Sequence, residues 1–194
     1  MTGVSDRLPY EDQVKLLLKV VPNIRTLGMV YNSGESNAVF GVEQTRMACK
    51  KLGLQLKTAS ISSSSEVYSA AKSLAPSVDA FYSGSDNTVV SAINSLVKVA
   101  RENKKPLLAG DSESVKNGAL LTNGIDYKKV GTMCADMMDR ILKGEKPGNI
   151  DVSYLGGGQL VINLDAAKAM NVTLPPEIVR AASIVYPRDA KKSQ

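Results

Sequence analysis

Three segments of the chain repeat one pattern: a short apolar run, then a cluster of small polar residues, then an amphipathic helical segment. The apolar runs are residues 26–31, 80–82 and 106–109, and the clusters NSGESN, SGSDNT and GDSES follow them. Alternating strands and helices of this kind build a parallel sheet with helices on both faces. In open parallel sheets, small ligands bind beyond the carboxyl ends of the strands. The polar clusters therefore stand where a ligand would bind.

The periodicity of apolar residues predicts the elements around these clusters. Predicted strands cover residues 26–31, 55–60, 80–82, 106–109, 119–122 and 159–163, and the main predicted helices cover residues 10–21, 38–52, 89–100 and 127–142. Ser63 and Glu66 have the spacing of a capping box, which starts a helix that ends near Leu74. The predicted fold class is α/β, a three-layer, doubly wound, mostly parallel sheet.

Composition favours binding over catalysis. The chain has no histidine, and we find no nucleophile beside an obvious base. Its two cysteines fall inside predicted helices, and Cys134 lies on an apolar stripe, so we expect a buried thiol rather than a metal ligand. We expect no enzyme activity, no cofactor and no metal site.

The net charge of +5 does not by itself indicate a nucleic-acid partner. The basic residues are scattered, and Arg188, Lys191 and Lys192 belong to a polar tail. With two Phe and no Trp, few side chains can stack on bases, so we predict no nucleic-acid binding. No apolar run is long enough to span a membrane, and the first thirty residues lack the pattern of a signal peptide.

An ordered series of motifs resembles one known family. The segments are TGVSD, VYNSGESN, DAFYSGSDNT, PLLAGD, DYKKVG, ILKGEKP and LVINLDAAKAMNVTLPPEI. Together, over residues 2–184, they resemble the ABC-transporter substrate-binding proteins of the tryptophan/tyrosine-binding type. The resemblance implies the type I periplasmic-binding-protein fold, whose two lobes close around a ligand.

The same resemblance implies a domain organisation. Residues 1–122 correspond to the second, ligand-binding lobe, and residues 123–194 to the hinge crossing and the C-terminal elements that return to the first lobe and back. Most of the first lobe has no counterpart here, so we expect a truncated chain. The apolar stripe of residues 127–142 would then lack its usual partner, unless the chain forms a homodimer or another chain supplies the lobe.

Amino-acid receptors of this fold hold the ligand ammonium with a carboxylate and the ligand carboxylate with hydroxyl and backbone N–H groups. Asp111 follows the strand at residues 106–109, where similar receptors offer an acid to the ammonium. It equally suits the cap of a helix beginning near Glu113. Asp86 and Asn87 follow another strand; one of them can cap the next helix, and we expect at least one to contact the ligand.

Ser33, Glu35 and Asn37 are further ligand-binding candidates, because they follow the strand at residues 26–31. A helix cap is the alternative role for Asn37, while Ser33 and Glu35 are expected to face the cleft. Tyr82 is a candidate to flank an aromatic or aliphatic ligand side chain. Its alternative is a core tyrosine with a solvated hydroxyl.

These observations predict the solute-binding component of an ABC importer, which presents its ligand to a membrane permease. The ligand would be an amino acid, aromatic by family analogy, or a similar small polar molecule. By resemblance the protein is extracytoplasmic, either periplasmic or lipid-anchored at the cell surface. The alternatives are a cytoplasmic sensor or enzyme domain on a doubly wound fold, or a non-functional fragment whose apolar surface drives dimerisation.

Overall fold

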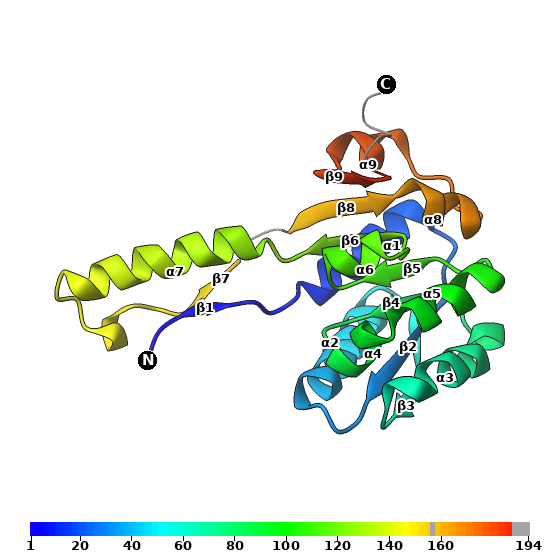
Figure 1. The fold of residues 1–194 in the computed structure, drawn as a ribbon, viewed down its shortest axis with the longest axis horizontal. Coiled ribbons are helices and arrows are strands. Elements are labelled where there is room, and N and C mark those ends of the chain that lie inside the picture. Colours follow the sequence, from blue (N-terminus) through cyan, green and yellow to red (C-terminus); the bar gives the residue numbers. More distant parts are fainter. Residues whose placement is uncertain (156–157, 188–194) are drawn as a thin grey trace.

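A seven-stranded sheet runs through the body of the protein, and a narrow arm projects from it (Figure 1). The computed structural model describes residues 1–155 and 158–187. The strands of this sheet are β2 (Thr26–Asn32), β3 (Gln55–Ile61), β4 (Ala80–Ser83), β5 (Leu107–Ala109), β6 (Leu121–Gly124), β8 (Gln159–Asn163) and β9 (Ile184–Tyr186). Their order is β3-β2-β4-β5-β6-β8-β9, and neighbouring strands are parallel except for the antiparallel pair β6 and β8.

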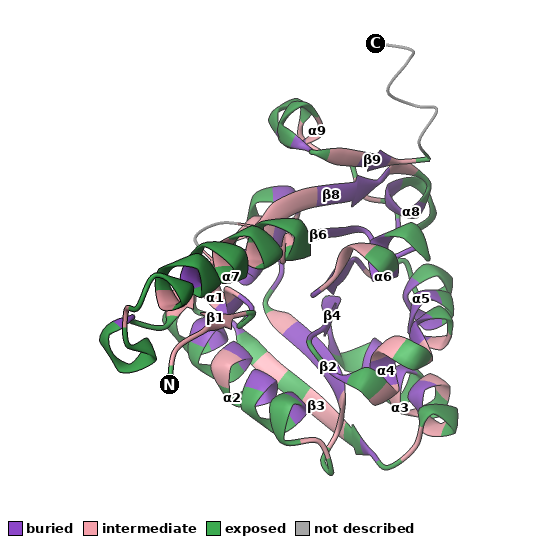
Figure 2. Cartoon of the chain, turned by 60° about the vertical axis from the view of Figure 1, so that its left-hand side comes forward, coloured by how far each residue is buried: buried purple, intermediate pink, exposed green. Residues whose placement is uncertain are grey.

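Helices cover both faces of this sheet, which confirms the predicted three-layer α/β architecture. The helices of the body are α1 (Tyr10–Val20), α2 (Ser36–Lys51), α3 (Val67–Leu74), α4 (Asn87–Ser91), α5 (Ile93–Glu102), α6 (Ser112–Lys116), α8 (Leu164–Ala169) and α9 (Pro176–Ala181). On one face α1 packs against α2, and on the other α3 packs against α5 (Figure 2). Strands β4 and β5 are buried along their whole length, so the core lies at the centre of the sheet.

Two predicted helix boundaries differ from the structure. Helix α2 begins at Ser36, two residues before the predicted start. The predicted helix over residues 89–100 is two helices, because the backbone leaves the helical conformation at Ala92. The helix predicted after the serine run does form, and it follows a short 3-10 turn in which the Glu66 carboxylate accepts a hydrogen bond from the Ser63 hydroxyl at 2.8 Å.

The arm consists of a helix lying on a two-stranded parallel ribbon. The helix is α7 (Tyr127–Leu142), and the strands are β1 (Val4–Ser5) and β7 (Ser153–Tyr154). The chain passes between arm and body at three points: between β1 and α1, between β6 and α7, and between β7 and β8 (Figure 1). The first residues of the chain therefore lie with the arm rather than with the body.

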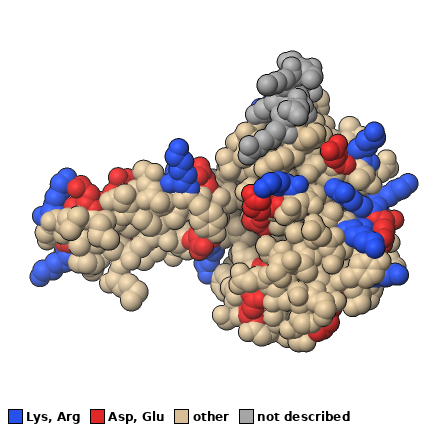
Figure 3. All heavy atoms as spheres, in the orientation of Figure 1, with Lys and Arg blue, Asp and Glu red and all other residues tan. Residues whose placement is uncertain are grey.

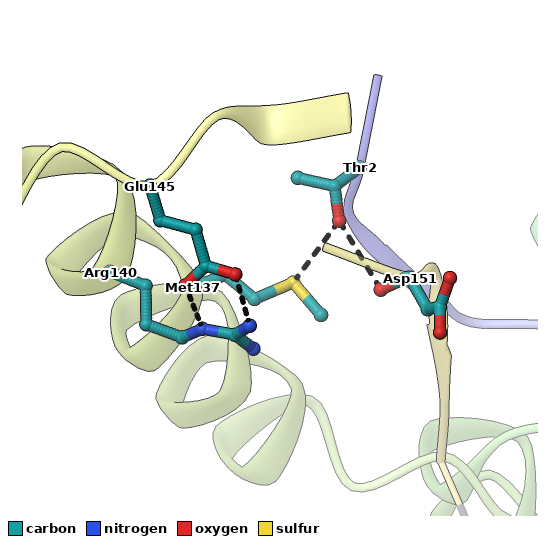
Figure 4. Close-up of polar contacts among 5 residues, drawn as sticks. All are labelled: Thr2, Met137, Arg140, Glu145 and Asp151. Atoms are coloured by element: carbon teal, nitrogen blue, oxygen red, sulfur yellow. Dashed lines mark hydrogen bonds and ion pairs between the residues drawn. The ribbon is translucent and has the colours of Figure 1, made fainter. Parts of the chain in front are cut away.

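Polar contacts hold the arm together (Figure 4). The Thr2 hydroxyl lies 3.3 Å from the Asp151 carbonyl oxygen and 3.9 Å from the sulfur of Met137, which is the buried residue of α7. Past the helix end, the Arg140 guanidinium donates two hydrogen bonds to Glu145, at 2.8 and 2.7 Å. These contacts close the turn after α7 and fix the first residues of the chain beside it.

One side of the apolar stripe of α7 is uncovered. Met138 is 56% exposed and Leu142 is 80% exposed. Cys134 is also exposed, so the prediction of a buried thiol at this position was wrong. The physical reason is that the apolar stripe of α7 is wider than the surface that the β1 and β7 ribbon covers.

Charged residues of both signs are interspersed over the face of the molecule that Figure 3 shows, on the arm as well as on the body. Many are paired within one helix, as Lys15 is with Glu11 at 2.6 Å. The basic tail residues Arg188, Lys191 and Lys192 lie outside the described residues.

Candidate functional site

Two adjoining cavities lie beyond the carboxyl ends of the central strands, beside the crossings to the arm. The inner cavity, of about 240 Å³, is lined by Leu8, Gly84, Ser85, Asp86, Asn87, Val90, Gly110, Asp111, Ser112, Ile125 and Tyr127. The outer cavity, of about 560 Å³, is lined by Ser5, Asp6, Arg7, Leu8, Tyr10, Ser36, Asn37, Phe40, Ser85, Asn87 and Tyr127. Four residues are common to both, so the two cavities form one continuous region at the strand ends.

Asp86 organises the loop between β4 and α4. One carboxylate oxygen accepts from the backbone N–H of Val89 at 2.9 Å, which caps α4, and the other accepts from the backbone N–H of Asn32 at 2.6 Å. The side chain is buried. Asp86 therefore lines the inner cavity while both of its oxygens already hold the loop ends of β2 and β4 together.

Glu35 also holds the loop between β4 and α4, through hydrogen bonds to Asn87 and Thr88. Its carboxylate accepts hydrogen bonds from the Thr88 hydroxyl at 2.6 Å, from the backbone N–H groups of Thr88 and Asn87 at 3.0 Å, and from the Asn87 amide at 2.9 Å. These donors, the Thr88 hydroxyl first, lower the pKa of Glu35 to about 2. Among the described residues Glu35 lines neither cavity, so the structure does not support the expectation that it faces the cleft.

The Glu35 contact also orients the Asn87 amide. One of its N–H groups donates to Glu35, which leaves the other N–H and the amide oxygen of Asn87 available to the cavities. Asn37 behaves similarly, because its amide nitrogen donates to the Ser85 carbonyl oxygen at 2.7 Å. Asn37 does not cap α2, since the helix begins at Ser36 and Glu35 occupies the capping position. Each amide thus has one N–H bound to a protein oxygen and keeps a second N–H and its oxygen.

Asp111 caps a helix and also lines the inner cavity. It caps α6: its Oδ1 accepts from the backbone N–H of Ser114 at 2.7 Å and its Oδ2 from the Ser114 hydroxyl at 2.6 Å. The carboxylate is partly exposed and lines the inner cavity. Because each carboxylate oxygen has a second acceptor site, the cap leaves Asp111 able to accept from a bound molecule.

The structure does not bring Ser33 or Tyr82 to this region. Ser33 is exposed and lines neither cavity. Tyr82 is fully buried, and its hydroxyl donates to the side-chain oxygen of Gln13 at 2.6 Å. Burial raises the pKa of Tyr82 well above its ordinary value. Tyr82 is therefore a core residue on the α1 face, and its hydroxyl binds protein rather than solvent.

The sequence interpretation missed the residues of the first crossing. Asp6, Arg7 and Leu8 line the cavities, although TGVSD was noted only as a family motif. The Tyr127 hydroxyl lies 3.4 Å from Asp6 Oδ2. Burial raises the pKa of Tyr127, and the negative charges of Asp6 and Asp111 raise it further. Two carboxylates from different parts of the chain therefore act on one hydroxyl at the edge of the inner cavity.

Close packing shapes the floor of the inner cavity. A Cβ added at Gly110 would lie 2.9 Å from Leu8 Cδ1 and 3.3 Å from the carbonyl carbon of Gly84. Gly110 thus lets the first crossing approach the ends of β4 and β5. Leu8, Val90 and Ile125 give this cavity an apolar surface beside the Asp111 carboxylate.

Two negative findings concern the described residues. No group of three or more potential metal-ligating side chains of His, Cys, Asp or Glu comes together in them. Within the same part of the chain, every helix is too short or too polar to span a lipid bilayer.

Comparison with known proteins gives consistent matches. Residues 1–186 match the family model for the ABC transporter substrate binding protein. The tyrosine-binding protein of Clostridioides difficile is 34% identical over 172 residues, which cover 89% of this chain and 50% of that protein. The chain therefore spans half the length of that relative.

Two solved structures share both fold and sequence with the chain. A conserved domain protein from Vibrio cholerae has a TM-score of 0.85 and 36% identity, over 95% of this chain and 62% of that one. An ABC domain from Streptococcus pneumonia in complex with L-Trp has a TM-score of 0.82 and 32% identity, over 95% of this chain and 64% of that one.

Proposed function

The chain belongs to the family of ABC transporter substrate-binding proteins, and from that membership we propose that its body is the second lobe of a two-lobed solute receptor. The arm, made of α7, β1 and β7, would belong to the first lobe, and the three crossings would form the hinge. Two lobes that close about a hinge enclose a ligand between them. The position of the cavities beside the crossings supports this assignment.

The proposed ligand is an amino acid with an aromatic side chain. The observation that carries this proposal is the Asp111 carboxylate at the inner cavity, held by Ser114 and bordered by the apolar side chains of Leu8 and Ile125. A carboxylate suits an ammonium, and an apolar surface suits a ring. The relatives support it, because one is named a tyrosine-binding protein and another was solved with L-Trp.

Such a lobe would bind its ligand and would catalyse no reaction. The receptor would act outside the cytoplasm and present the closed form to an ABC permease, as the family name implies. The absence of histidine from the chain supports binding over acid–base catalysis, for which histidine is the commonest residue.

The uncovered face of α7 supports a first-lobe partner. Exposed apolar side chains on a helix need a covering surface, and the first lobe is the partner we propose for Met138 and Leu142. A second copy of the chain is the alternative. Sedimentation of the 194-residue chain distinguishes them, because a homodimer gives a mass that rises with concentration and a single lobe does not.

The first experiment measures the intact mass of the protein from the envelope fraction of its own cells. This mass identifies the native form of the protein, which is then used in the binding assays. Calorimetry on that form with L-tyrosine and L-tryptophan then tests binding. Asp111→Asn should weaken binding about 10- to 100-fold, the scale of a charge-assisted hydrogen bond, and should change stability little because Asn is also a good cap.

Ser114→Ala is the matched variant, since it removes a partner of Asp111 and keeps the charge. Its effect on affinity should be smaller than that of Asp111→Asn. Equal affinity of wild type and Asp111→Asn would exclude Asp111 from the site. Failure of the native form to bind any aromatic amino acid would contradict the proposed ligand.

A further inference from the structure

Apart from one side chain, the polar side chains that line the two cavities in the described residues are carboxylates, amides and neutral hydroxyls. Asp6 and Asp111 are carboxylates, and the amides of Asn37 and Asn87 each donate one N–H to a protein oxygen. An amino acid is a zwitterion, and none of these groups gives its carboxylate the positive charge that makes a charge-assisted hydrogen bond. These groups offer a charged partner to the ligand ammonium and none to the ligand carboxylate.

Arg7 is the one cationic side chain among the described residues that line the two cavities. Its guanidinium carbon lies 4.3 Å from the centre of the Phe40 ring. Among the described residues it forms no ion pair, whereas many other basic side chains, such as Lys15, Lys51 and Arg140, are paired with carboxylates. A guanidinium stacked on a ring keeps its edge N–H groups available for a carboxylate, which it can bind through two hydrogen bonds.

Four residues, Leu8, Ser85, Asn87 and Tyr127, line both cavities and mark their boundary. An amino acid with its α-carbon at this boundary can direct its ammonium toward Asp111 in the inner cavity and its carboxylate into the outer one. Resting on the proposed function, we propose that Arg7, held in place by Phe40, binds the carboxylate of the ligand. Because Arg7 lies on the first crossing, this contact links ligand recognition to the hinge.

A cycle of protein and ligand changes tests the role of Arg7. Arg7→Gln and Arg7→Lys are compared with wild type for binding of L-tyrosine and L-tryptophan and of tyramine and tryptamine, which lack the carboxylate. The native form identified by intact mass is used, with calorimetry as the readout. Arg180→Gln, on α9 at the far edge of the sheet, removes the same charge away from the cavities and is the control.

We expect Arg7→Gln to weaken amino-acid binding about 10- to 100-fold and amine binding less than about threefold, since the lost contact is charge-assisted. Arg7→Lys should lie between, because lysine cannot make the paired contact. If Arg7→Gln weakens the binding of amino acids and amines equally, Arg7 acts on the fold alone. If it weakens neither, the ligand carboxylate binds elsewhere. Either result overturns the proposal. If the wild-type protein binds amino acids, these outcomes test only the role of Arg7. If it binds none, the proposed function is wrong and the role of Arg7 is wrong with it.

Discussion

Glu35 joins the loop after β2 to the start of α4, so removing its charge should destabilise the body. Its carboxylate accepts two hydrogen bonds from Thr88 and two from Asn87. Lowering its pKa from 4.5 to about 2 corresponds in full to about 3 kcal/mol of stabilisation. The carboxylate is partly exposed, and solvent screening reduces that figure. We therefore predict that Glu35→Gln lowers the free energy of unfolding by about 1–2 kcal/mol at pH 7.

The effect of Glu35→Gln should depend on pH in one direction. The pKa of Glu35 is lower in the folded state than in the unfolded chain, so its stabilisation is present above about pH 4.5 and is lost as the pH falls toward 2. Urea unfolding of wild type and variant at a series of pH values measures this. The difference in unfolding free energy should be constant from pH 7 to 5 and should shrink below pH 4.5.

Glu43→Gln, on the helix α2 that follows Glu35, is the matched control, because Glu43 is exposed and its partner Arg46 lies at 3.5 Å. That change should cost less than about 0.5 kcal/mol. Amide hydrogen exchange adds a local readout, since the backbone N–H groups of Asn87 and Thr88 should lose protection in Glu35→Gln. A difference between wild type and Glu35→Gln that persists unchanged at pH 3, or unaltered exchange at Thr88, would refute the reasoning.

Three further predictions concern packing and exposure. Tyr82→Phe leaves a buried side-chain acceptor without its donor and should cost about 1–2 kcal/mol in urea unfolding, with no change in ligand affinity. Gly110→Ala places a methyl group against Leu8, and it should cost about 1–3 kcal/mol and weaken binding by displacing the first crossing. In the 194-residue chain a thiol reagent should modify the exposed Cys134 rapidly. Burial raises the pKa of Cys49 to about 11, so Cys49 should react only after unfolding. Equal reaction rates at the two cysteines would contradict the structure.

The strands were predictable because buried parallel strands are nearly continuous apolar runs that end in polar residues. All six predicted strands form, and the one predicted at residues 119–122 is displaced by two residues. The break at Ala92 was not predictable from periodicity, because residues 89–100 carry one uninterrupted apolar stripe. A stripe reports which face is buried, and it does not report whether the backbone between two turns stays helical.

The candidate site was predictable only where one residue's role depends on its neighbours in sequence. Asp111 follows β5 directly and caps the next helix through Ser114, three positions away, so sequence spacing was sufficient. Glu35 binds Asn87, 52 positions away, and Tyr82 binds Gln13, 69 positions away. Partners at such separations are brought together by the order of strands in the sheet, and the sequence does not state that order.

The prediction of a buried Cys134 was wrong for the same reason that apolar residues of the arm are exposed. A parallel sheet is normally covered on both faces, and a two-stranded unit is at best marginally stable by itself. The β1 and β7 ribbon has two residues in each strand and is too small to cover the whole apolar stripe of α7, on which Cys134 and Met138 stay exposed. The body, in contrast, has a continuous core on both sides of its sheet. Because the first crossing carries Asp6 and Arg7 from this arm to the cavities, a first lobe packed on the arm should strengthen ligand binding both by holding the crossing in place and by closing over the ligand.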